Sequence, residues 1–253
     1  MIAPYWQSEA HGIALYHGDA WAIVPELPRP DHVISDPPYG ERTKKGARST
    51  RRTQHLSDDA HELGAPIVPW AVSAQSLRDL CTLVSARRWS LLFCDYIHAA
   101  CLDANPPSGL RHLRTAPWVK PNGAPQLSGD RPAHSFETIA CLHADGACRW
   151  NSHGKRGVYE HLVVANAVHP NEKPQPLLRK LMCDFTDRDE LIADPFAGSS
   201  AHLLAALSLG RRAWGVELEE RWCEVGAKRL EDAIRQGVLF EARPEPTQME
   251  LVA

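Results

Sequence analysis

Short apolar runs and helically spaced apolar residues alternate along most of the chain. The runs predict strands at 13–17, 32–36, 89–94, 114–120, 136–143, 190–194 and 212–217. The helical spacing predicts helices at 70–86, 177–185, 200–209 and 219–236. Several of these strands are apolar throughout, which is typical of a parallel sheet covered on both faces. We therefore expect an α/β fold, with a mostly parallel seven-stranded sheet and helices on both faces.

Polar segments interrupt this alternation. The segments 41–66 and 145–160 show no apolar period, so we expect surface loops there. The segment 97–112 is broken by two prolines and a glycine, which predicts irregular structure. The tail at 240–253 is expected to be disordered. Without an internal repeat, residues 1–253 are interpreted as a single domain.

Composition favours a globular protein and predicts a cytoplasmic location. Apolar residues make up 43% of the 253 positions, enough for a buried core. No apolar run approaches the roughly 18 residues that span a bilayer, and the first residues lack the pattern of a signal peptide. The cysteines are scattered without a CxxC pair, which predicts reduced thiols and neither a disulfide framework nor a metal site.

The charge of the chain neither supports nor excludes a nucleic-acid partner. The net charge of −3 argues mildly against one, because nucleic-acid binders are usually basic. Phosphates are nevertheless neutralised by local patches. The candidates form two clusters, Lys44, Lys45, Arg48, Arg51 and Arg52, and then Arg149, Lys155 and Arg156. Each cluster is as typical of a solvated loop as of a phosphate-binding one.

Residues 191–217 combine a strand, a turn of small residues, a helix and a second strand that ends in an acid. The turn at 197–200 lets a ligand approach the backbone at a helix N-terminus, and Glu217 can accept from both hydroxyls of a ribose. This pattern indicates a nucleotide-type site. The turn holds a single glycine, Gly198, so an ordinary strand–helix–strand unit stays open as the alternative.

The corner Asp36-Pro37-Pro38-Tyr39 follows a buried strand and so lies at the carboxyl edge of the sheet, where α/β proteins bind ligands. The prolines fix the backbone and hold the Pro37 carbonyl outward. The Asp36 carboxylate and this carbonyl are adjacent acceptors, and Tyr39 adds an aromatic ring. The trio suits a planar group that bears an NH2. The alternative is a strand-ending turn with a surface tyrosine.

Three segments together resemble a known family. Residues 36–39 (DPPY) resemble motif IV of the amino-methyltransferases, and residues 194–200 (DPFAGSS) resemble their motif I. Residues 169–174 (HPNEKP) resemble the HPTxKP segment that precedes motif I in the permuted beta group of DNA methyltransferases. Motif IV comes first here, as in that group. The resemblance covers residues 13–236 and implies a Rossmann-like, S-adenosylmethionine-dependent methyltransferase fold.

The resemblance also implies a role for each matching residue. In the corner completed by Pro38, Asp36 and the Pro37 carbonyl hold the target amine, and Tyr39 stacks on the flipped base. The implied cofactor residues are Asp36, Asp19 near the adenine, Glu217 and Leu218 at the ribose, Asp194, Phe196, Ala197, Gly198, Ser199 and Ser200 at the methionine half, and His169, Pro170, Asn171 and Lys173 over the methionine end. The family usually has Gly where Ser200 stands and Thr where Asn171 stands.

The implied reaction is methyl transfer from S-adenosylmethionine, which leaves S-adenosylhomocysteine, to an exocyclic amine of a base flipped out of double-stranded DNA. No metal is required. Residues 13–120 then form the catalytic half and 169–236 the cofactor-binding half, while 41–66 and 145–160 contact DNA. Asp36 favours adenine N6, because many cytosine-N4 enzymes carry Ser at that position. Cytosine N4 remains the alternative.

Other functions fit the residues less well. A catalytically silent DNA-binding protein of this fold would not need Asp36, Tyr39 and Glu217 intact. RNA and protein-glutamine methyltransferases usually place the glycine motif first, and a nicotinamide oxidoreductase would carry a three-glycine fingerprint. The recognition sequence, a homodimer and a cognate restriction endonuclease are left open by the sequence.

Overall fold

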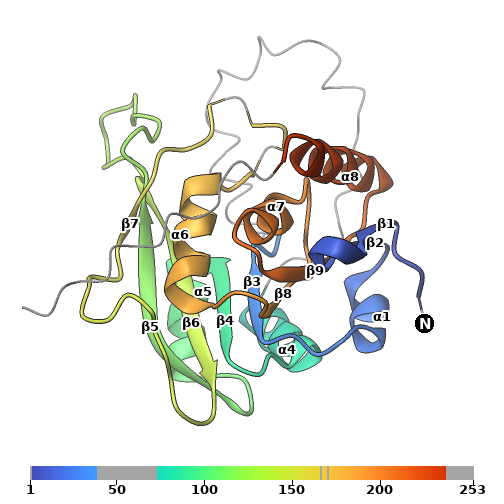
Figure 1. The fold of residues 1–253 in the computed structure, drawn as a ribbon. Helices are drawn as coiled ribbons and strands as arrows, with labels where there is room; N and C mark the ends of the chain where they lie inside the picture. Colours follow the sequence, from blue (N-terminus) through green and yellow to red (C-terminus); the bar gives the residue numbers. More distant parts are fainter. Residues whose placement is uncertain (1, 39–72, 166, 170, 238–253) are drawn as a thin grey trace, which may run out of the picture.

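The structure, a computed structural model, describes residues 2–38, 73–165, 167–169 and 171–237. Its described strands form one sheet in the order β1-β2-β9-β8-β3-β4-β6-β5-β7 (Figure 1). The strands are β1 (Trp6–Ser8), β2 (Ile13–His17), β3 (His32–Ser35), β4 (Trp89–Cys94), β5 (Leu110–Val119), β6 (Phe136–Ala144), β7 (Tyr159–Glu160), β8 (Leu191–Asp194) and β9 (Arg212–Glu217). The helices are η1 (Glu9–His11), α1 (Ala20–Ile23), η2 (Val24–Glu26), α4 (Ala74–Val84), α5 (Tyr96–Ala104), α6 (Gln175–Phe185), α7 (Ala201–Ser208) and α8 (Glu220–Arg235).

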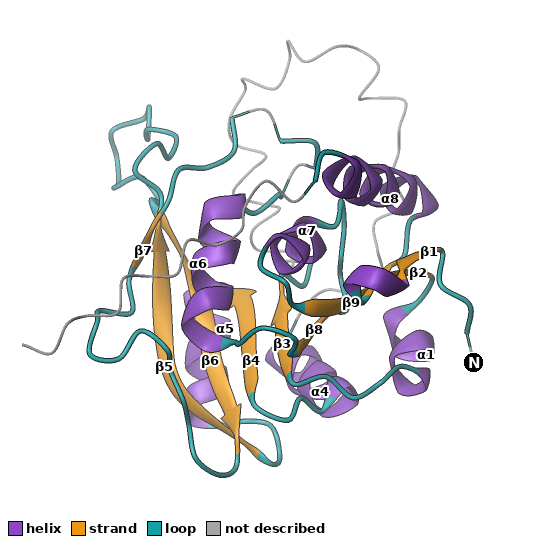
Figure 2. Cartoon of the chain, in the orientation of Figure 1, coloured by secondary structure: helices purple, strands orange, loops and turns teal. Residues whose placement is uncertain are grey.

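The centre of the sheet is parallel. β2, β9, β8, β3 and β4 run in one direction, whereas β6 runs against both β4 and β5 (Figure 2). The carboxyl ends of β2, β3, β8 and β9 therefore meet at one edge. The prediction of a mostly parallel sheet is confirmed, but the count of seven strands is wrong. The described sheet has nine strands, because the edge strands β1 and β7 are too short to show a pattern in the sequence.

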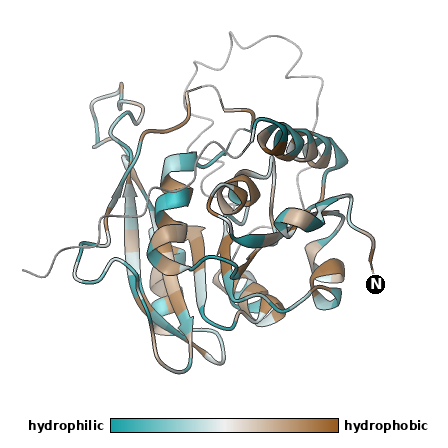
Figure 3. Cartoon of the chain, in the orientation of Figure 1, coloured by the Kyte–Doolittle hydropathy of each residue, from teal (hydrophilic) through white to brown (hydrophobic). Residues whose placement is uncertain are grey.

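Helices cover both faces of the sheet, as predicted. Leu91 and Phe93 of β4 pack into one core with α6, α7 and α8, whereas Leu92 and Cys94 pack into a second core with α1, α4 and α5 (Figure 1). Successive residues of a strand point to opposite faces, so a fully apolar strand feeds two cores. α7 is apolar over most of its surface because it lies between α6 and α8, whereas the outer side of α8 is hydrophilic (Figure 3).

The prediction of irregular structure at 97–112 is wrong. The first half of this segment lies in the helix α5, and β5 begins within its last residues. The carboxylate of Asp95 caps the helix by accepting from the backbone N–H of His98 at 2.8 Å. Ala99 and Leu102 are buried on its inner side. The two prolines follow the last turn, where they end a helix without breaking it.

The loop expected at 145–160 is irregular up to β7, as predicted, and it is anchored to the end of α6. The backbone N–H of Asn151 donates to the carbonyl of Asp184 at 2.7 Å. Ser152 donates to the carboxylate of the same residue. The segments 41–66 and 240–253, for which a loop and a disordered tail were predicted, lie outside the described residues.

A close contact joins α8 to the turn that precedes α7. A Cβ at Gly226 would lie 2.3 Å from Oγ of Ser200 and 3.3 Å from Cδ2 of Leu15. Ser200 itself has φ of 63°, in the left-handed region that favours glycine. Gly226 therefore lets α8 approach the turn, and Ser200 occupies a strained backbone position.

We expect Gly226→Ala to lower the free energy of unfolding by about 1–3 kcal/mol, the usual effect of overpacking. By helix propensity alone, replacing glycine with alanine in a helix interior would stabilise the protein by about 1 kcal/mol. A loss of stability would therefore show the effect of the close contact. Adding Ser200→Gly should restore stability, because it removes both the contact and the left-handed strain. Urea unfolding of the single and double variants measures the coupling, with Gly157→Ala, which meets open space, as the control. A Gly226→Ala variant as stable as wild type would contradict the prediction.

Candidate active site

A cavity of about 590 Å³ opens at the carboxyl edge of the parallel strands. This is within the usual size of ligand pockets, roughly 300–1,000 Å³. The predicted residues that line it are Asp19, Asp36, Pro37, Pro38, His169, Asn171, Lys173, Phe196, Ala197, Gly198, Ser199, Glu217 and Leu218. Tyr39 and Pro170 lie outside the described residues. The sequence motifs of both halves of the chain therefore meet in one place.

The glycine turn forms one wall of the cavity. Gly198 follows β8 with φ of 49°, and a Cβ on it would lie 3.8 Å from the ring of His169. Its backbone N–H donates to Oε2 of Glu217 at 2.8 Å, and the backbone N–H of Glu219 donates to Oε1 at 2.8 Å. Glu217 thus fixes the turn against the end of β9. Each carboxylate oxygen has a second lone pair, so Glu217 can still accept from a ligand hydroxyl.

Burial raises the pKa of Glu217 above its usual value, and the two backbone donors partly offset the shift. Asp19, which follows the neighbouring strand β2, also has two roles. Its carboxylate accepts from the backbone N–H of Trp21 at 3.0 Å and caps α1, while Asp19 also lines the cavity. Both acids therefore hold local structure as well as facing the cavity.

Asp194 lies beneath the cavity and not in its wall. It is 1% exposed, and Oδ1 accepts from the hydroxyl of Ser35 at 2.7 Å and from the backbone N–H of Phe196 at 3.1 Å. Nδ1 of His202 lies 2.8 Å from Oδ2. Ser200 is also fully buried outside the lining. These two residues therefore do not line the cavity, and their contact with the cofactor stays a prediction.

The Asp36 corner forms the opposite wall. Oδ2 of Asp36 pairs with Nζ of Lys173, which lies 3.4 Å from Oε2 of Glu137. Glu137 is in turn paired with Lys120. Oδ1 of Asp36 is buried and has no hydrogen-bond partner among the described residues. One oxygen of the carboxylate is fixed and the other is left for a ligand.

Asp36 and Lys173 each stabilise the charged form of the other. Burial raises the pKa of Asp36, and Lys173 opposes that rise. Burial by itself would lower the pKa of Lys173, but the neighbouring Asp36 and Glu137 outweigh it and raise this pKa above its usual value. Lys173 is only 4% exposed. It therefore stays charged and acts as the counter-ion of Asp36.

The sequence did not single out several residues of the cavity. They are Trp21, Glu172, His202, Glu219 and Trp222. The ring of Trp222 lies against that of His169, with centroids 4.5 Å apart. The fragment HPNEKP already held Glu172, but its glutamate matched no family position. His202 carried no signal, since a lone histidine on an apolar helix is usually a core residue.

Arg229 of α8 links two walls of the cavity and was also missed. Its guanidinium donates to the carbonyl and the hydroxyl of Ser199 at 2.8 and 2.7 Å, and it pairs with Glu172. The other oxygen of Glu172 accepts from the backbone N–H of Val168 at 3.0 Å. The loop that carries His169 is thereby tied to the glycine turn.

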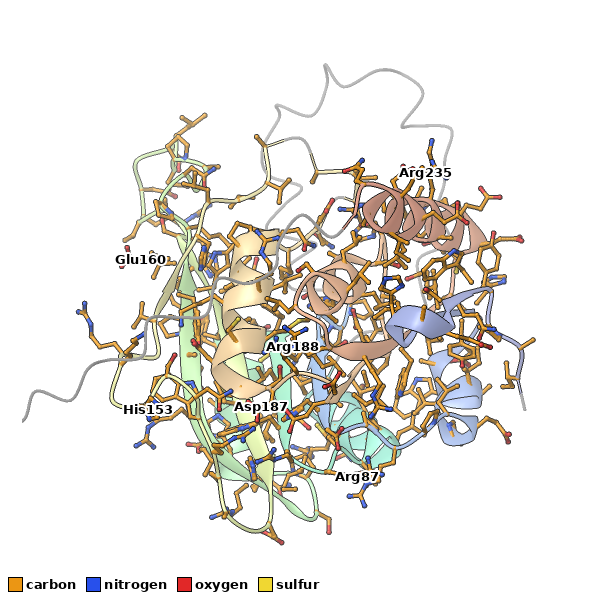
Figure 4. The ribbon with its side chains drawn as sticks, in the orientation of Figure 1. Arg87, His153, Glu160, Asp187, Arg188 and Arg235 are labelled. Atoms are coloured by element: carbon orange, nitrogen blue, oxygen red, sulfur yellow. The ribbon has the colours of Figure 1, made fainter. Side chains whose placement is uncertain are left out.

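Among the described residues that were predicted to contact DNA, Arg149 lies away from the cavity. Arg149 pairs with Asp187 and lies 3.8 Å from Glu190, both of which precede β8. Asp187 is seen at the lower end of the molecule, near Arg188 (Figure 4). Arg149 is therefore at the amino edge of the sheet, opposite the cavity, which argues against the predicted contact.

The remaining basic candidates divide into two groups. Lys155 and Arg156 are exposed in the loop before β7. Lys44, Lys45, Arg48, Arg51 and Arg52 lie outside the described residues. In the part of the chain that is described, no cluster of three His, Cys, Asp or Glu side chains could hold a metal ion. Nor is any helix there long and apolar enough to cross a membrane.

The cavity fits S-adenosylmethionine chemically. Its acids, Asp19, Asp36 and Glu217, suit a sulfonium cation and a ribose. The rings of Trp21 and Trp222 suit a purine and a cation. Oδ1 of Asp36, which has no hydrogen-bond partner among the described residues, is an acceptor for a second ligand beside the cofactor.

Comparison with known proteins agrees with this geometry. A model of the DNA methylase family matches residues 30–228. The type II methyltransferase M2.MboI of Moraxella bovis is 36% identical over 258 residues, which cover 91% of this chain and 92% of that protein. The M1.HpyAVI–SAM complex has the same fold, with a TM-score of 0.63 and 23% identity over 86% of this chain and 98% of that one. The cytosine-N4-specific PvuII DNA methyltransferase has a TM-score of 0.66 and 13% identity, over 93% of this chain and 95% of that one.

The matched region spans both walls of the cavity, from β3 to α8, and the M2.MboI relative extends along nearly the whole chain. The chain therefore belongs to the family of DNA methylases that modify adenine N6 or cytosine N4.

Proposed function

We propose that this DNA methyltransferase places its methyl group on the exocyclic N6 of adenine. The observation that carries the proposal is the buried Asp36, whose Oδ2 is fixed by Lys173 and whose Oδ1 has no partner among the described residues. A buried acceptor without a donor costs about 1–3 kcal/mol, which a bound amine would recover. An aspartate here favours adenine over cytosine within the family, since many cytosine-N4 enzymes carry Ser. We also infer that the chain belongs to the permuted beta group, because its Asp36 corner precedes its glycine turn.

Asp36 and the carbonyl of Pro37 activate the amine by geometry. The lone pair of an adenine amine is delocalised into the ring, which makes the nitrogen a poor nucleophile. Two acceptors placed for a tetrahedral nitrogen favour the pyramidal form that is reached in the transition state. Lys173 contributes by fixing Oδ2, so that Oδ1 keeps its direction. When bound, S-adenosylmethionine supplies an electrophilic methyl group, and the cavity walls align it with the nitrogen.

DNA contact is assigned to the basic run that follows the corner in the sequence. Lys44, Lys45, Arg48, Arg51 and Arg52 follow the Asp36–Tyr39 corner within a few residues in the sequence, and this proximity is what favours them as phosphate contacts of a flipped base's duplex. Lys155 and Arg156 are secondary candidates. Such residues position the duplex through its phosphates and carry no base information. Tyr39 is assigned to stacking on the flipped base.

Asp36→Ala is expected to abolish methyl transfer while S-adenosylhomocysteine still binds, because Oδ1 faces the base side. Loss of a preorganised hydrogen-bonding group of this kind costs about 10²–10³ in rate. A tritiated-methyl assay and calorimetry measure the two effects, with Asp36→Asn as the isosteric variant that lacks the charge. Modification mapping on random-sequence duplex DNA identifies the base that the wild type methylates. N4-methylcytosine in place of N6-methyladenine would overturn the proposed specificity, and retained turnover would overturn the role of Asp36.

Glu217→Ala is expected to weaken S-adenosylhomocysteine binding by about 1–3 kcal/mol, the order of a lost charge-assisted hydrogen bond. The loss has two sources, the ribose contact and the release of the Gly198 and Glu219 backbone donors. Glu217→Gln keeps one acceptor and should lose less. Calorimetry measures the dissociation constants, with the exposed Glu224→Ala on α8 as the control. An unchanged constant in Glu217→Ala would remove this residue from the cofactor site.

Lys173→Gln is expected to move the acid limb of the pH–rate profile to higher pH. Asp36 must be ionised to accept the amine, and burial holds its pKa above the usual value. The activity is therefore present above this raised pKa and lost as the pH falls through it. Lys173 lowers the same pKa, so its removal raises it further. Single-turnover rates across pH test this, with Lys120→Gln as the control, because Lys120 pairs with Glu137 and not with Asp36. An acid limb at the wild-type position would contradict the prediction.

A further inference from the structure

Two buried polar atoms at the cavity lack hydrogen-bond partners within the described part of the chain. One is Oδ1 of Asp36, and the other is Nε2 of His202. Both residues line the cavity. Buried polar side-chain atoms are almost always paired, and exceptions gather at functional sites. The first atom is explained by the target amine, whereas the second has no role in the reaction described so far.

The position of His202 fixes which of its nitrogens is free. It is the second residue of α7, 4% exposed, with its ring against that of Phe93. Nδ1 lies 2.8 Å from Oδ2 of Asp194. This is an ion-pair distance without hydrogen-bond geometry, since Oδ2 of Asp194 also has no hydrogen-bond partner among the described residues. The nearby negative charge favours a proton on Nδ1, which leaves Nε2 as an acceptor.

We propose that Nε2 of His202 is the catalytic base that accepts the proton lost by the target nitrogen. The inference rests on the proposed function, transfer to an exocyclic amine. An NH2 group that gains a methyl group must lose one proton to become a neutral secondary amine. Asp36 is already paired with Lys173 through Oδ2 and holds the amine through Oδ1. His202 supplies a second acceptor that lines the same cavity.

The step balances in atoms and in charge. The N–C bond forms as the C–S bond breaks, and the electron pair of that bond stays on sulfur. The N–H bond then breaks, its pair returns to nitrogen, and the proton forms a bond to Nε2. The positive charge that left sulfur thus reappears on the imidazole.

The charged groups around His202 suit this change. Asp194 comes from β8, Asp36 from the end of β3 and Lys173 from the loop before α6, with Glu217 at the end of β9. The imidazole is the group that gains charge, and Asp194 beside it stabilises the imidazolium. His202 lowers the pKa of Asp36, which places the two side chains within electrostatic reach. Proton uptake by His202 therefore helps to keep Asp36 ionised for the next base.

The competing explanation is structural, with His202 serving only to neutralise the buried Asp194. The variant His202→Asn separates the two, because an asparagine amide can still donate to Asp194 but offers no base at the position of Nε2. His202→Gln provides a second variant if the first unfolds. His32 is the matched control, since it is also buried and paired with an acid, Glu190, but lies at the amino edge of the sheet.

The experiment uses the full chain and a duplex that the wild type methylates. We expect His202→Asn to bind S-adenosylhomocysteine like the wild type in calorimetry, while its single-turnover rate constant falls by about 10²–10⁴, the usual contribution of a general base. Its rate constant should then rise about tenfold per pH unit in alkaline solution, as hydroxide replaces the missing acceptor, whereas that of the wild type stays level. His32→Asn should lower the melting temperature without changing the rate constant.

Two results would overturn the inference. One is a His202→Asn rate constant equal to that of the wild type. The other is a loss of rate that only matches a loss of S-adenosylhomocysteine affinity and keeps the wild-type pH profile, which would make His202 a structural partner of Asp194. Failure of the proposed function is distinguished separately, because the wild type itself would then leave no methyl group on an exocyclic amine of the duplex.

Discussion

The active site depends on the burial of two acids, Asp36 and Asp194, at the carboxyl ends of the neighbouring strands β3 and β8. A buried carboxylate is costly unless it is paired and hydrogen-bonded. Lys173 supplies the counter-ion for Asp36, and Ser35, the Phe196 backbone and His202 surround Asp194. Two of these pairings, Lys173 with Asp36 and Ser35 with Asp194, join residues far apart in the sequence. They therefore join the two halves of the chain at one edge of the sheet.

A second set of contacts shapes the cofactor side around the backbone of the glycine turn. Glu217 accepts from Gly198, and Arg229 donates to Ser199. Arg229 also pairs with Glu172, which connects the loop that holds His169 to the turn. The side chains that are expected to bind the cofactor thus also hold the cavity walls in place. Such preorganisation limits the cost of ordering the site when the methyl donor and the base bind.

Several features of the protein could be read from the sequence. Apolar runs such as 89–94 predicted strands, because a strand buried on both faces has no polar side, and the DPPY and DPFAGSS segments marked the strand ends that meet at the cavity. These are local properties, set by the few residues involved. The prediction of irregular structure at 97–112 was wrong, because it was based on the prolines and the glycine near the end of the segment. The first half is a short helix that is capped by Asp95 and stabilised by burial of Leu102.

Only the tertiary structure decided how the side chains of the site are used. The motif residue Asp194 faces the sheet, and the basic candidate Arg149 pairs with Asp187 at the far edge. His202 and Arg229 carried no motif, yet His202 lines the cavity and Arg229 joins Ser199 to Glu172. Partners of this kind can lie far apart in the sequence, as Ser35 and Asp194 do at a separation of 159 residues, and they are chosen by which strand ends lie side by side. The sequence alone therefore determined the elements and the chemical class of the site, whereas the fold assigned each buried charge to its partner.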